Sequence, residues 1–225
     1  MHWLFEAKKR YGLTILNYTV TSNHIHLLVV DSDRDVIPKS IQLAAGRTAQ
    51  EFNKRRNRKG AYWEDRYHAT AIEADNHLYR CIAYIDLNMV RAGVVNHPSE
   101  WIFSGYNEIQ HPPKRYRLID HKKLTELCGF EDAAKLRKSH KSWAEEGLEG
   151  STGMRDPYWS ESIAVGTREF VEETKVKLGY KVHGRKIEPH DEMYVLRETR
   201  NSYNTVFEPQ KHRLRLGNGH YWRKY

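Results

Sequence analysis

The stretch of residues 20–30, Val-Thr-Ser-Asn-His-Ile-His-Leu-Leu-Val-Val, restricts the fold of this chain more than any other. After the turn residues Ser22 and Asn23, polar and apolar side chains alternate, which predicts a β-strand. Residues 13–20 are also rich in strand-forming side chains. The two segments together predict an antiparallel hairpin.

The predicted hairpin carries two histidines one residue apart, His24 and His26. Side chains alternate between the two faces of a strand, so both imidazoles lie on the same face. Such a pair is half of a divalent-metal site. Two polar residues on the solvated face of an edge strand give the same pattern, so the spacing alone leaves both interpretations open.

One helix is predicted before the hairpin in the sequence and one after it. Residues 3–11 have the pattern of the end of a helix, which Gly12 stops. Residues 38–56 predict a second helix with an apolar face. Its end is strongly basic, and the residues concerned are Lys54, Arg55, Arg56, Arg58 and Lys59. This end is either a solvated terminus that complements the helix dipole or a surface that contacts phosphates.

A third helix is predicted over residues 75–92, with Asp75 as its N-cap and Gly93 after its last turn. Residues three and four apart share a face of a helix, so Tyr84 and Asn88 project together, one turn apart. Beside them runs a stripe that we expect to be buried, made of Leu78, Ile82, Ile85 and Met89.

Composition favours a nucleic-acid partner. The 225 residues contain 37 Lys and Arg against 29 Asp and Glu, which gives a formal net charge of +8. Lys and Arg neutralise phosphates, and aromatic side chains stack on bases. All charges in residues 210–225 are basic, which suits a contact with a nucleic-acid backbone; they are Lys211, Arg213, Arg215, Arg223 and Lys224.

Several classes of protein are excluded by what the sequence lacks. No apolar run is long enough to span a bilayer, and the first ten residues are charged and have no signal-peptide core. Cys81 and Cys128 lie far apart and form no metal-type or disulfide-type spacing. We therefore expect a soluble cytoplasmic protein with no membrane partner.

Three blocks of sequence, residues 22–29, 62–69 and 78–93, together resemble a known family. They are similar, in order and spacing, to the IS200-like, single-tyrosine (Y1) transposases of the HUH nucleases, and in particular to the REP-associated tyrosine transposases. The resemblance covers about residues 1–107. It implies a prokaryotic, nucleoid-associated protein that cleaves and rejoins single-stranded DNA, at hairpin-forming sequences.

The resemblance also assigns roles to residues. His24, His26 and Asn88 match the ligands of Mg²⁺ or Mn²⁺, and Tyr84 matches the nucleophile that forms a 5′-phosphotyrosine. Tyr79 is the rival nucleophile, but it lies off that helix face. We expect the DNA contacts to come from the basic helix end (Lys54, Arg55, Arg56 and Arg58), together with Arg66 and Arg91.

The fold that the resemblance implies is α+β, with a ferredoxin-like antiparallel sheet and helices on one face. The strand that usually precedes the first helix has no counterpart here, so we expect the sheet to lack its first strand. Residues 1–107 would form the nuclease domain. Residues 108–225 would form a basic extension, mostly helical over 120–147 and again over 163–178. The oligomeric state, monomer or homodimer, stays open.

Two alternative functions remain. A decayed protein of the same fold could bind hairpin DNA without cutting it. An unrelated histidine phosphoesterase or nucleotide hydrolase would also use alternating histidines. A histidine-triad protein would need a histidine at position 28, where this chain has Leu28, and no second histidine strand with the spacing of a two-histidine phosphoesterase is present.

Overall fold

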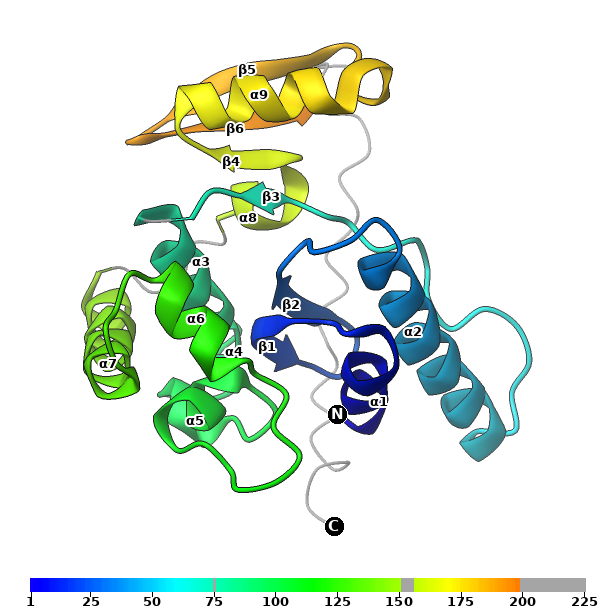
Figure 1. The fold of residues 1–225 in the computed structure, drawn as a ribbon. Helices are drawn as coiled ribbons and strands as arrows, with labels where there is room; N and C mark the ends of the chain where they lie inside the picture. Colours follow the sequence, from blue (N-terminus) through cyan, green and yellow to red (C-terminus); the bar gives the residue numbers. More distant parts are fainter. Residues whose placement is uncertain (75, 151–155, 199–225) are drawn as a thin grey trace.

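A β-hairpin lies at the centre of the N-terminal half (Figure 1). The computed structural model describes residues 1–74, 76–150 and 156–198. Strands β1 (Ile15–Val20) and β2 (Ile25–Val29) pair antiparallel, with Thr19 opposite His26. The predicted hairpin is therefore confirmed.

Helices α1 (His2–Tyr11) and α2 (Val36–Arg55) lie on one side of this hairpin (Figure 1). Gly12 ends α1 in the left-handed conformation, with φ of 73°, and its N–H donates to the Lys8 carbonyl. Glycine adopts this conformation without the steric penalty of a Cβ atom. Both helices thus occur where the sequence predicts them.

Irregular segments cover the outer edge of β1. Thr19 bridges to Ser104 and Ile15 to Ile119, and the Val20 N–H donates to the Phe103 carbonyl. Within the described residues, β2 pairs only with β1. The hairpin is therefore a two-stranded sheet.

The tyrosine helix is interrupted where a continuous helix is predicted. Helix α3 (Asn76–Asp86) stops at Leu87, which has φ of −80° and ψ of 3°, and α4 (Asn88–Arg91) follows. The prediction of one helix to residue 92 is therefore wrong at Leu87. The Tyr84 carbonyl, which residue 88 would use in a continuous helix, accepts a hydrogen bond from Arg91 Nη2. The predicted stripe on this helix is buried, whereas the predicted N-cap Asp75 lies outside the described residues.

Four helical segments follow along the chain. They are η1 (Pro98–Glu100), α5 (Gly105–Gln110), α6 (His121–Leu127) and α7 (Ala133–Glu149). Helix α7 packs on α3, where Tyr79 stacks on Trp143. The expectation of helix over residues 120–147 is thus largely confirmed.

A second sheet lies at one end of the molecule (Figure 1). Its strand order is β3 (Ala71–Ile72), β4 (Ala164–Gly166), β6 (Met193–Glu198) and β5 (Arg185–His190). All neighbours are antiparallel except β3 and β4, which are parallel. Helix α8 (Tyr158–Glu161) precedes β4, while α9 (Arg168–Leu178) and the turn η2 (Gly179–Val182) follow it.

The predicted helix over residues 163–178 is wrong in its first part. Residues 164–166 form β4, and α9 begins only after Thr167, whose side chain accepts from the Phe170 N–H. Ala164 and Val165 are fully buried between two neighbouring strands. A short apolar run of this kind fits a buried strand or a helix equally well, and long-range pairing decides between them.

The main hydrophobic core draws on both halves of the chain. It brings together Ile15 and Ile82 with Ile119, Leu124 and Val165, all of them almost fully buried. A smaller core under α9 contains Ala164, Val171, Val182 and Leu196. The molecule is mixed α and β with small, mostly antiparallel sheets, which agrees with the α+β class. No described helix has the length and apolar character that crossing a membrane requires.

Candidate active site

The two histidines of the hairpin lie side by side. The ring centroids of His24 and His26 are 5.0 Å apart, and the ring planes are inclined by 83°. His26 lies on β2, and His24 directly precedes that strand. The alternation in the sequence thus does bring the two imidazoles together.

The turn before β2 orients the His24 ring. Its Nδ1 lies 2.8 Å from Asn23 Oδ1 and 3.0 Å from Thr21 Oγ1. An amide oxygen can only accept, so Nδ1 donates to it, and in the neutral imidazole the lone pair is then on Nε2. A neighbour that fixes the tautomer in this way is the usual second contact of a histidine that binds a metal.

Tyr84 joins this pair from α3. Its ring centroid is 6.0 Å from that of His26, and only 7% of its surface is exposed. The ring of Trp159, from α8, lies 6.3 Å away on another side. Tyr79, which stacks on Trp143 of α7, does not take part.

Arg91 also packs against Tyr84. Its guanidinium carbon lies 4.1 Å from the centre of the Tyr84 ring, and Nη2 donates to the Tyr84 backbone carbonyl at 2.6 Å. Burial lowers the pKa of Arg91, and the neighbouring Tyr84 and Asp156 oppose that shift. A half-buried cation over an aromatic face is an attractive arrangement. The structure therefore places Arg91 within the tyrosine site.

Asn88 is the first residue of α4 and is half-buried. Leu87 separates it from α3, so it lies just past the interruption, about one turn after Tyr84. The Ala92 N–H donates to its backbone carbonyl.

The donor set near Tyr84 suits a cation held by few protein ligands. Within the described ranges, no group of three His, Cys, Asp or Glu side chains gathers to hold a metal. Two imidazoles that each place one nitrogen about 2 Å from a shared cation have ring centres about 5 Å apart. The separation of His24 and His26 fits this, and further ligands would come from an amide, water or substrate oxygens.

The predicted basic surface lies on the other side of the hairpin from α3 (Figure 1). The cations at the end of α2 and Arg66 are exposed. Arg58 donates to the Ala61 carbonyl and Asn53 to that of Gly60, and these bonds hold the loop after α2. Phe52, Tyr62 and Trp63 form a chain of aromatic contacts next to it. No ion pair with a described carboxylate involves Lys54, Arg55 or Arg58.

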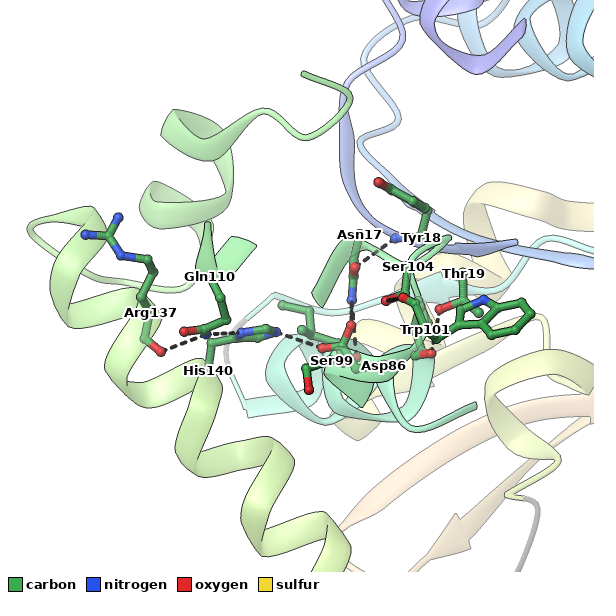
Figure 2. A network of polar contacts seen from close by, with 12 residues as sticks. Asn17, Tyr18, Thr19, Asp86, Ser99, Trp101, Ser104, Gln110, Arg137 and His140 are labelled. Carbon is green, nitrogen blue, oxygen red and sulfur yellow. Dashed lines mark hydrogen bonds and ion pairs between the residues drawn. The ribbon is translucent and has the colours of Figure 1, made fainter. Parts of the chain in front are cut away.

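A buried polar network next to the site was not predicted (Figure 2). Asp86, the last residue of α3, is 2% exposed. It accepts hydrogen bonds from Asn17 of β1 at 3.0 Å and from His140 of α7 at 2.7 Å. One signal was available, because Asp86 is a charged residue within the apolar run 82–90.

Comparison with known proteins adds one finding to this geometry. Residues 2–88 match the family model described as transposase IS200 like. The N-terminal part of the chain is therefore similar to IS200-like transposases, and this similarity supports a transposition-related activity on DNA. The match covers less than half of the chain, and it includes His24, His26, Tyr84 and Asn88. No curated protein and no solved structure gives a significant match.

Proposed function

We propose that this IS200-like protein cleaves and rejoins single-stranded DNA through a covalent bond to Tyr84. The observation that carries the proposal is the contact of the Tyr84 ring with His26, beside His24. This contact lies within the segment that matches the transposase family.

The reaction is a transesterification. The Tyr84 hydroxyl oxygen attacks the scissile phosphorus, and the bond from phosphorus to the 3′-oxygen breaks. The products are a 5′-phosphotyrosine and a free 3′-OH. The phenol releases its proton to solvent, and the leaving 3′-oxygen takes up a proton from solvent. Attack by a 3′-OH on the phosphotyrosine reverses these bonds, so rejoining needs no external energy source.

His24, His26 and Asn88 are the residues that would hold Mg²⁺ or Mn²⁺. When bound, such an ion would supply Lewis-acid polarisation of the scissile phosphate. Arg91 would add a positive charge over the ring that carries the attacking oxygen. Only 7% of Tyr84 is exposed, and Trp159 and Arg91 are the neighbours that cover its ring.

DNA binding would involve the tyrosine site on the α3 side of the hairpin and the basic end of α2 on the other side. The exposed cations Lys54, Arg55, Arg56, Arg58 and Arg66 would contact phosphates. The target that we propose is a hairpin-forming, REP-like repeat on chromosomal DNA. Residues 1–107 would supply the nuclease chemistry and residues 108–225 an extension, in a monomer or a homodimer.

The test is a denaturing gel with labelled single-stranded hairpin DNA and Mn²⁺. The wild type and Tyr79→Phe should form a covalent protein–DNA adduct, whereas Tyr84→Phe should form none. Chelation of the metal, or the double change His24→Ala and His26→Ala, should also abolish the adduct. An adduct that persists in Tyr84→Phe would overturn the assignment of the nucleophile.

The second candidate is a protein that binds hairpin DNA without cutting it. The burial of Tyr84 under Trp159 favours it. A mobility shift of the DNA with no adduct, in a sample whose circular dichroism shows that it is folded, would establish this alternative.

A further inference from the structure

We propose that Asp86, with its partners Asn17 and His140, is a positioning residue that sets the place of Tyr84 relative to His26. The inference rests on the proposed function for its meaning in catalysis. Its geometric part, the dependence of the Tyr84 environment on Asp86, stands by itself.

Asp86 ends the helix that carries Tyr84, and two other elements hold it. Asn17 Nδ2 donates to one carboxylate oxygen and His140 Nε2 to the other (Figure 2). Asn17 is 0% and His140 1% exposed. Charge-assisted hydrogen bonds in a buried place are strong, and together they fix both the position and the rotation of the helix end.

The hydrogen bonds of this network run in one direction, from Gln110 through His140 to Asp86. The contacts of Gln110 determine that direction. Gln110 Nε2 donates to the Arg137 carbonyl at 3.0 Å and to His140 Nδ1 at 2.7 Å. His140 Nδ1 is therefore the acceptor of the Gln110 bond, and Nε2 is the nitrogen that faces Asp86. In this arrangement the Nε2–H of His140 donates to the Asp86 carboxylate.

The same strand ties this helix turn to His26. Asn17 Nδ2 also lies 3.3 Å from the Ile82 carbonyl, and Thr19 Oγ1 donates to the Ile85 carbonyl at 2.9 Å. Thr19 is the register partner of His26 across the hairpin. The residues on both sides of Tyr84 are thus bonded to β1, which is paired with the strand that carries His26.

A purely apolar contact would hold α3 against β1 without fixing its rotation or its height. A buried carboxylate is costly unless every partner is in place, so it tolerates one arrangement. Displacement of a reacting group by about 1 Å can lower a rate by about a hundredfold. Disruption of the network would therefore misalign Tyr84, and the misalignment would be measured as a lower rate of attack by Tyr84.

The test compares four variants with the wild type. Asp86→Asn and His140→Leu break the network, and His140→Gln keeps a donor toward Asp86 and serves as the rescue. Tyr18→Phe is the matched control, because the Tyr18 hydroxyl donates to the buried Glu108 carboxylate from the other face of β1. If Asp86→Asn fails to fold, Thr19→Val takes its place in the test. This change removes only the hydrogen bond to the Ile85 carbonyl.

Two measurements are made at a temperature where each variant is folded. The first is the single-turnover rate of adduct formation at saturating hairpin DNA, together with the DNA dissociation constant. The second is the ¹⁹F resonance of 3-fluorotyrosine placed at position 84, which needs no activity.

We expect the adduct rate to fall about 10- to 100-fold in Asp86→Asn and His140→Leu, with the dissociation constant within about twofold of the wild type. The ¹⁹F resonance should shift or split in these two variants and return toward the wild-type position in His140→Gln. Tyr18→Phe should change neither measurement. Wild-type rates and an unmoved resonance in the folded network variants would overturn the inference. A wild type that forms no adduct while the resonance still moves would instead overturn the proposed chemistry.

Discussion

Gly105, at the start of α5, lies where the polar side chains next to β1 leave no room for a Cβ atom. A Cβ there would lie 2.1 Å from Asn17 Oδ1 and 3.1 Å from the Tyr18 nitrogen. We expect Gly105→Ala to lower the free energy of unfolding by about 1–3 kcal/mol, because a tightly packed core accommodates extra volume poorly. Gly46→Ala in α2 is the control: no atom lies within 4 Å of its added Cβ, and stability should rise by about 0.5–1 kcal/mol. Urea unfolding followed by circular dichroism measures both, and equal changes would contradict the expectation.

His121, the first residue of α6, predicts a dependence of stability on pH. Burial lowers its pKa below the usual 6.5, and the nearby Arg117, Lys8 and Arg137 act in the same direction against Glu108. The unfolded chain therefore takes up a proton near pH 6.5 that the folded chain does not. The contribution of His121 is complete above that pH and is lost as the pH falls.

Urea midpoints at pH 7.5 and pH 5.5 test this dependence. The midpoint should fall more in the wild type than in His121→Gln, because the glutamine does not titrate. All other histidines contribute to both proteins alike. The same fall in both proteins would show that His121 titrates as it does in the unfolded chain.

Among the elements, helix α9 depends on a carboxylate from the other half of the chain. The Thr167 N–H and its hydroxyl group both donate to the Glu73 carboxylate, which follows β3. Negative charge at a helix N-terminus is favourable. We expect Glu73→Ala to lower the free energy of unfolding by about 1 kcal/mol or more. Glu172→Ala, which breaks only the exposed pair with Arg168, should cost about 0.5 kcal/mol or less. Urea unfolding measures both changes. An equal loss in the free energy of unfolding for Glu172→Ala and Glu73→Ala would contradict the expectation.

Whether an element could be predicted from the sequence depended on how local its cause is. The hairpin and α1 follow from short-range alternation and from the stop at Gly12, and both occur as predicted. The strand β4 depends on pairing with β3 and β6, far away in the chain, and no pattern in residues 163–178 contains that information. At the interruption at Leu87, the Arg91 side chain bonds to the Tyr84 carbonyl, and helix propensity does not include such a contact.

The residues of the candidate site also differ in whether a local pattern in the sequence predicts them. The nearness of His24, His26 and Tyr84 could be predicted because the histidines share a strand face and the family resemblance supplied the tyrosine. Trp159 and His140 could not, since they reach the site from α8 and α7 and no local spacing marks them. Trp159, His140 and Gln110 lie beyond the transposase match, whereas Asn17 and Asp86 lie within it.

At the scale of the whole molecule, the excess positive charge should appear as a salt effect. Replacing Lys54, Arg55 and Arg58 with Gln should weaken binding of any single-stranded DNA. The slope of log affinity against log salt should become shallower by about 0.7 for each phosphate that the variant no longer neutralises. The control replaces Lys122, Lys138 and Lys141, which are exposed on α6 and α7, and removes the same net charge. Fluorescence anisotropy at several salt concentrations measures both slopes, and equal slopes would argue that the end of α2 is not the binding surface.

The core that the two halves share limits how this chain can be rearranged. Trp159 and Val165 belong to the same core as Ile82, and β3 finds its partner in β4. A gene fusion that exchanged the first 107 residues as a cassette would leave β3 unpaired and uncover the tyrosine helix. Shuffling between relatives should therefore succeed only when the segments around Trp159 and β4 are inherited with that helix.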